Sequence, residues 1–82
     1  MPLEDNNTAL SIKNYLQNNY AVRLKSDQIS KDGVLVGWKI TVYDANNAVV
    51  TDVSKQYLVE AMRAIFVEIV GQSELDTFED TL

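Results

Sequence analysis

Cysteine and histidine are absent from this chain of 82 residues, and it contains only three glycines and one proline. Without cysteine it can form no disulfide, no thiolate metal site and no thiol nucleophile. Without histidine it lacks the usual general base near neutral pH and the usual ligand of zinc or copper. The glycines are too widely separated to form a phosphate-binding loop. We therefore expect no enzymatic activity, no cofactor and no bound metal.

Asp44 and Asp52 are the remaining candidates for catalysis, because two neighbouring carboxylates can share acid and base roles. Both also have structural explanations. Asp44 begins the turn sequence DANNA, and Asp52 precedes a predicted helix, where aspartate is a favoured N-cap. The structural explanation is favoured for both.

The composition indicates one folded domain, since hydrophobic residues make up 46% of the chain and charged residues 23%. The N-terminal residues MPLED show neither the basic segment nor the apolar run of a secretory signal. The longest nearly apolar stretch, residues 57–70, contains charged residues and is too short to cross a bilayer. We expect a cytoplasmic protein.

Apolar periodicity predicts two long helices with three strands between them. The predicted helices span residues 9–18 and 55–70, and the predicted strands span residues 20–25, 34–44 and 48–52. Asn7 or Thr8 can cap the first helix, and Asp52 or Ser54 the second, which Gly71 ends. The polar segment 26–33 is predicted to be a turn.

This order predicts an α+β fold, α-β-β-β-α, in which both helices pack on one face of a three-stranded antiparallel sheet. A short third helix is expected at the C-terminus. The predicted parts are a flexible N-terminal segment (1–7), a single domain (8–71) and an acidic C-terminal segment (72–82). In the second strand, Trp38 shares a face with Ile40 and Val42, so we expect it to be the core anchor beneath the second helix.

Three valines lie on the side of the second helix where a solvent face should be polar. We call this predicted surface the valine strip; it consists of Val59, Val67 and Val70, interrupted by Arg63. Such a strip suggests cover by the tail of the chain or by another chain, including a second copy. The alternative is a helix central enough to be buried nearly all round.

The C-terminal segment combines four carboxylates with Leu75, Phe78 and Leu82 at helical spacing. Residues 8–71 are nearly neutral, with seven bases against six acids, so the negative charge lies at the two ends. We expect a short amphipathic helix, capped by Ser73. It should be ordered only when docked on the second helix or on a partner.

The predicted element order resembles that of double-stranded RNA-binding domains, and the resemblance covers the layout of residues 8–71. Those domains carry a basic cluster at the start of the second helix, where this chain reads SKQYLVEA with one lysine. The best phosphate-binding surface is instead the open sheet face, beside Lys31 in the adjoining segment. That face consists of Arg23, Lys25, Lys39 and Tyr43.

The expected function is that of a small non-enzymatic protein–protein interaction module, an adaptor or inhibitor of bacterial or phage origin. Its predicted partner-binding residues are Val59, Arg63, Val67, Val70, Leu75 and Phe78. The alternatives are weak nucleic-acid binding through the open sheet face, and an acidic nucleic-acid mimic that inhibits a nucleic-acid-binding enzyme. The expected partner is another protein, or a second copy of this chain.

Overall fold

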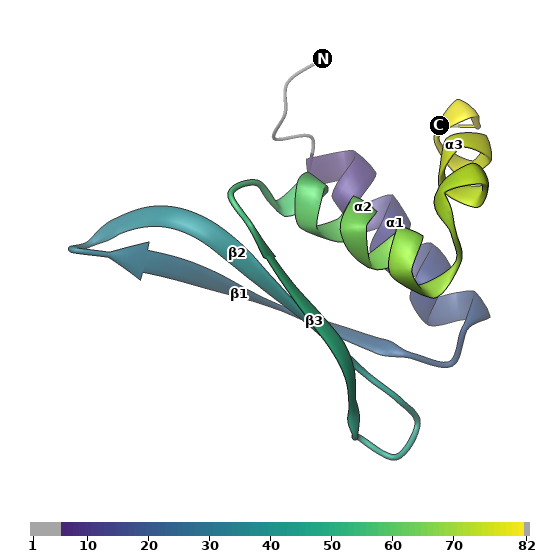
Figure 1. Cartoon of the computed structure of the whole chain (residues 1–82), viewed down its shortest axis with the longest axis horizontal. Coiled ribbons are helices and arrows are strands. Elements are labelled where there is room, and N and C mark those ends of the chain that lie inside the picture. The colour runs from purple at the N-terminus through teal and green to yellow at the C-terminus, as the bar shows by residue number, and fades with distance from the viewer. Residues whose placement is uncertain (1–5, 82) are drawn as a thin grey trace.

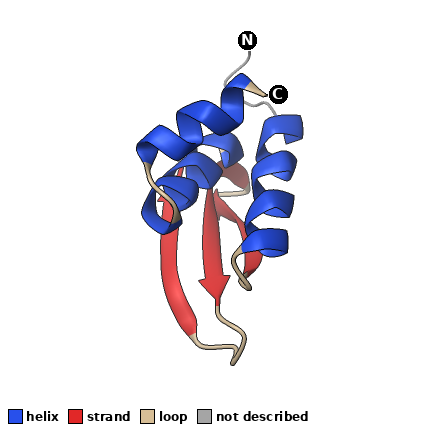
Figure 2. Ribbon diagram, turned by 90° about the vertical axis from the view of Figure 1, so that its right-hand side faces the viewer, coloured by secondary structure: helices blue, strands red, loops and turns tan. Residues whose placement is uncertain are grey.

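The computed structural model describes residues 6–81 and has the predicted α+β fold (Figures 1 and 2). Its elements are α1 Asn6–Asn19, β1 Arg23–Lys31, β2 Val34–Tyr43, β3 Val49–Lys55, α2 Leu58–Ile69 and α3 Gln72–Asp80. The strands form one antiparallel sheet in the order β1-β2-β3. The predicted fold class, including the third helix, is confirmed. Of the predicted flexible segment, residues 1–5 lie outside the described residues, and Asn6 and Asn7 belong to α1.

The β1–β2 hairpin is longer than predicted. Asp32 and Gly33 have φ angles of 54° and 80°, which is the conformation of the two-residue turn of a tight hairpin. The preceding polar residues, which we expected to form a turn, continue β1 to Lys31. All of them except Ile29 are polar, which fits a part of the strand whose two faces are both exposed, apart from the half-buried Ser26. The prediction of a long turn over residues 26–33 is therefore wrong.

The second helix begins later than predicted, because β3 continues to Lys55, which pairs with Trp38 of β2. Asp52 and Ser54 are therefore strand residues and do not cap α2. The residue before the helix, Tyr57, makes no side-chain cap hydrogen bond. The predicted end of the helix is one residue too late, since α2 ends at Ile69. Gly71, with φ of 129°, redirects the chain into α3, as its predicted role at the helix end suggests.

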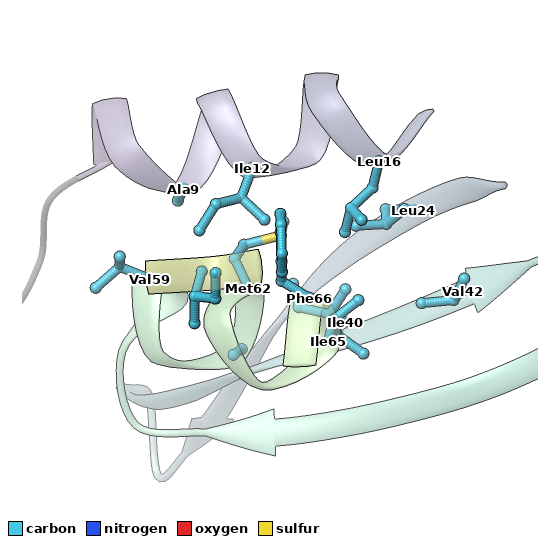
Figure 3. Packing of buried hydrophobic residues seen from close by; sticks show 12 residues of the cluster. Ala9, Ile12, Leu16, Leu24, Ile40, Val42, Val59, Met62, Ile65 and Phe66 are labelled. Atoms are coloured by element: carbon cyan, nitrogen blue, oxygen red, sulfur yellow. The ribbon is translucent and has the colours of Figure 1, made fainter. Parts of the chain in front are cut away.

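The core lies between the sheet and the two long helices (Figure 3). Its buried apolar members are Ala9, Ile12, Leu16, Leu24, Ile40, Val42, Val59, Ala61, Met62, Ile65, Phe66 and Leu75. Phe66 is the largest fully buried side chain. Among the side chains of residues 7–81, no buried nitrogen or oxygen lacks a hydrogen-bond partner. Burial of this core therefore leaves no side-chain polar group without a hydrogen bond.

Trp38 is half-buried and lies outside this core, so the prediction that it anchors the core is wrong. The reason is a difference in length. A helix of 12 residues, such as α2, is about 18 Å long, whereas a strand of 10 residues, such as β2, is about 33 Å long. The helices therefore cover Ile40 and Val42 but leave Val34 and Val36 exposed, and Trp38 lies at the boundary.

Candidate functional site

The valine strip predicted on α2 is not a free surface. Val59 is 1% exposed and belongs to the core (Figure 3). Val67 and Val70 are partly buried and pack against the core. The cause is the central position of α2, which contacts α1, β2, β3 and α3. Val59 is buried in the core, as the alternative of a helix buried nearly all round requires, while α3 packs against α2, as expected for cover by the tail. Cover by another chain stays a prediction.

The acidic tail forms α3 and packs against α2 of the same chain. Leu75 is 3% exposed, and Phe78 packs against the core. Arg63 donates hydrogen bonds from Nε and Nη2 to the two carboxylate oxygens of Glu79, each at 2.9 Å. Of the two docking places predicted for the tail, the described structure has the one on α2. Ser73 is the second residue of α3 rather than its cap, and Leu82 lies outside the described residues.

Phe78 also joins α3 to α1 through aromatic contacts. Its ring centroid lies 4.9 Å from that of Tyr15 on α1 and 5.4 Å from that of Phe66 on α2. Tyr15 in turn stacks on Phe66 at 5.5 Å. The pKa of Tyr20, beside Tyr15, is raised by desolvation and by a hydrogen bond to the Tyr15 side chain. Since these contacts join three helices, Phe78 has a structural role within the domain, and Leu75 has one through its burial in the core.

The remaining acids of α3 are Glu74, Asp76 and Asp80, all of them exposed. They lie on one short helix, and the fourth acid, Glu79, is already paired with Arg63. A nucleic-acid mimic needs carboxylates spread over a rigid surface at the spacing of phosphates, and the described α3 offers a much smaller acidic area than that.

The four residues of the predicted nucleic-acid surface do lie on the open face of the sheet. The β1–β2 register pairs Arg23 with Tyr43, Lys25 with Thr41, and Asp27 with Lys39. Cζ of Arg23 lies 5.1 Å from the centroid of the Tyr43 ring, a cation–π contact. Carboxylates interrupt the positive charge, because Asp27 faces Lys39, and Asp52 of β3 faces Thr41. The face therefore carries mixed charge.

A different surface, which sequence reasoning missed, lies at the far end of the β1–β2 hairpin. We call residues 28–37 the arm; Figure 1 shows it extending beyond the helices. Because β3 ends opposite Trp38, the arm residues of β2 have β1 as their strand partner and are not paired with β3. Its exposed apolar side chains are Ile29, Val34, Leu35 and Val36, which are between 36% and 62% exposed.

The base of the arm is held by a close backbone contact. A Cβ atom added to Gly37 would lie 2.8 Å from the carbonyl oxygen of Lys55, so only glycine lets β3 approach this closely. Next to this contact, Ile29 pairs with Gly37 and Ser30 with Leu35, which leaves Val36 as the extra residue of a bulge. A recess at this place is lined by Ile29, Val36, Gly37, Ser54, Lys55 and Gln56.

A signal for the arm was present in the sequence. The predicted second strand of 11 residues would be about 36 Å long, whereas the predicted second helix of 16 residues would be about 24 Å long. One end of the strand therefore had to extend beyond the helices. The alternating Val34, Val36 and Trp38 were interpreted as core because a strand pattern identifies a face but not what covers it.

Asp44 has a structural role, as the favoured interpretation predicted. Its Oδ1 accepts hydrogen bonds from the N–H groups of Asn46 and Ala48, at 2.8 and 3.0 Å, within the β2–β3 turn. Over residues 6–81, no group of three or more aspartate or glutamate side chains is arranged to hold a metal ion. Within the same range, none of the helices has the length and apolar character that crossing a bilayer requires.

No protein-family model matches this chain, and no curated protein and no solved structure is significantly similar to it. Function is therefore inferred from the residues and their geometry.

Proposed function

We propose that this chain is a non-enzymatic protein–protein interaction module and that the arm is its partner-binding surface. The observation that carries the proposal is the group of four exposed apolar side chains on an element that extends beyond the helices. In the core, α1 and α2 already cover the apolar face of the sheet. The apolar residues of the arm have no such cover from the described chain, and exposed apolar groups of this kind mark interaction sites.

Two properties of the arm suit it to a protein partner. Its apolar side chains offer area that becomes buried on binding, which is the main favourable term of association. Its strands offer unpaired backbone groups at their outer edges, to which an extended segment of a partner can add as a further strand. Backbone hydrogen bonds then contribute affinity, while Leu35 and Val36 contribute specificity through the pockets they enter.

The test compares wild-type protein with Leu35→Lys in affinity capture from the source cells, with quantitative mass spectrometry of the bound proteins. Val50→Lys is the matched control, because Val50 is also exposed and apolar but lies in β3 at the other end of the sheet. We expect specific proteins to be retained by the wild type and the control and lost with Leu35→Lys. If Leu35→Lys retains the same proteins, or the wild type retains none, the proposal is wrong.

Nucleic-acid binding through the open sheet face is the second candidate, supported by the register that gathers Arg23, Lys25 and Lys39 beside Tyr43. If the protein makes three phosphate contacts, its affinity should fall roughly 40-fold when the salt concentration rises from about 50 to 200 mM. Fluorescence anisotropy with a double-stranded RNA measures this directly, with Lys39→Glu as the variant. Absence of binding at the lower salt concentration would exclude this candidate, whereas capture through Leu35 should depend little on salt.

A further inference from the structure

The outer edge of β1 is free to accept another strand along the arm. β1 is an edge strand of the sheet, and within the described residues no further strand pairs with it. The N–H of Leu24 donates to Oε1 of Gln17 on α1, at 3.0 Å, so it points away from β2. Because backbone groups alternate along a strand, those of Ser26, Gln28 and Ser30 also point outward. These groups form the edge that an added strand would meet.

We infer that a second copy of this chain pairs with this edge, β1 against β1, around a two-fold axis at Ile29. This inference rests on the proposed function in one respect, that the arm is the binding element. It adds the identity of the partner, a second copy of the chain. A closed dimer of identical chains requires the two strands to run antiparallel about a two-fold axis. The residues whose backbone N–H and C=O groups point outward must lie opposite each other. These are the even-numbered residues of β1, so even-numbered residues pair with even-numbered residues.

Charge excludes most of the registers that satisfy this condition. Axes at residues 25, 26, 27, 28 and 29 are those that pair at least five residues of the nine-residue strand. An axis at Lys25 places this lysine against itself. An axis at Asp27 places Asp27 against itself and Arg23 against Lys31, and an axis at Gln28 places Lys25 against Lys31. Like charges directly opposite each other destabilise a strand pair, so these three registers are unfavourable.

The register centred on Ser26 places Lys25 of each copy opposite Asp27 of the other, which is favourable, but two features of the structure obstruct it. It requires the outward N–H of Leu24, which already donates to Gln17, and it brings the second copy against the end of β1 that lies beside α1. The register centred on Ile29 has neither obstacle, because it uses the part of β1 that lies beyond the helices (Figure 1).

The Ile29 register is complementary throughout. It places Asp27 of each copy opposite Lys31 of the other, twice in the dimer, and it places the two Ile29 side chains against each other. All three residues are exposed and belong to one face of β1. Gln28 and Ser30 of opposite copies exchange backbone hydrogen bonds. The two sheets become one sheet of six strands, with the exposed Ile29 covered at its centre.

Sedimentation equilibrium over a range of concentrations tests the register through a charge exchange. We expect the wild type to form a dimer of twice 9.2 kDa. Asp27→Lys and Lys31→Asp should each raise the dissociation constant by about tenfold or more, because two attractive pairs become repulsive. The double variant should restore the dimer. Lys25→Asp is the control, since it makes the same charge change on the same face outside the paired residues.

Several outcomes would overturn the inference: a wild type that stays monomeric up to ~1 mM, a double variant that does not recover, or a control that weakens the dimer as much as Lys31→Asp. Asp27 faces Lys39 within the chain, so circular dichroism checks that Asp27→Lys folds. If Asp27→Lys does not fold, the register is tested by comparing the dimer dissociation constants of Lys31→Asp and Lys25→Asp. A monomeric wild type whose captured proteins still depend on Leu35 would refute the dimer and leave the proposed function standing.

Discussion

Truncation of Leu75 to alanine tests whether α3 is an integral part of the domain. Leu75 is the one side chain of α3 that belongs to the core, and it is 3% exposed. Replacing a buried leucine by alanine costs about 2–5 kcal/mol, from lost burial and the cavity left behind. A domain of this size has a free energy of unfolding of about 4–12 kcal/mol. The substitution should therefore remove a large part of the stability.

The loss has an upper limit set by the docking of α3. A helix of nine residues is not stable alone, so α3 should be helical only while it packs against α2 and α1. If α3 detaches before the rest unfolds, Leu75→Ala can cost no more than the free energy of docking. A chain that ends at Gly71 measures that limit, because it also loses Phe78 and the Arg63–Glu79 ion pair. The ion pair is about one-third exposed and contributes less than about 1 kcal/mol.

Urea denaturation followed by circular dichroism gives the free energy of unfolding of each variant. Asp80→Ala is the control, since Asp80 is exposed near the C-terminal end of α3, where a negative charge is unfavourable. We expect this control to equal or slightly exceed the wild type in stability. If Leu75→Ala and the chain ending at Gly71 both match the wild type within error, then α3 does not stabilise the domain and this reasoning is refuted.

Two other predictions follow from the packing of the core and the sheet. Phe66→Ala should cost about 3–5 kcal/mol, whereas Trp38→Ala should cost clearly less, because only Phe66 is fully buried; equal losses in urea denaturation would contradict this. Gly37→Ala should cost about 1–3 kcal/mol, because its Cβ would meet the backbone carbonyl of Lys55 at 2.8 Å; Val36→Ala, at the exposed neighbouring position, is the control, and equal thermal midpoints for the two variants would show that the strand can move away.

The kind and order of the elements could be predicted from the sequence because they depend on local patterns. A period near 3.6 marks α1 and α2, a period of two marks the start of β1 and most of β2, and Gly71 ends α2. Trp38, Ile40 and Val42 lie on the helix-facing side of β2, as expected, and Arg23, Lys25, Lys39 and Tyr43 share the other side of the sheet. These features need no knowledge of what lies above the strand. The bulge at Val36 ends the alternation in β2, so Val34 lies on the same face as Lys31.

What covers each face was decided only by the tertiary structure. The valine strip on α2 was interpreted as a separate surface, covered by the tail or by another chain, because a helical projection shows direction but not neighbours. In the folded chain, α1 and α3 enclose α2, so Val59 is buried and Leu75 and Phe78 are used internally. The same patterns could not show which end of β2 extends beyond the helices. In the structure it is the N-terminal end, where Val34 and Val36 of the arm are exposed and Trp38 lies at the edge of the core. Periodicity is a property of one element, whereas burial depends on the lengths and positions of at least two.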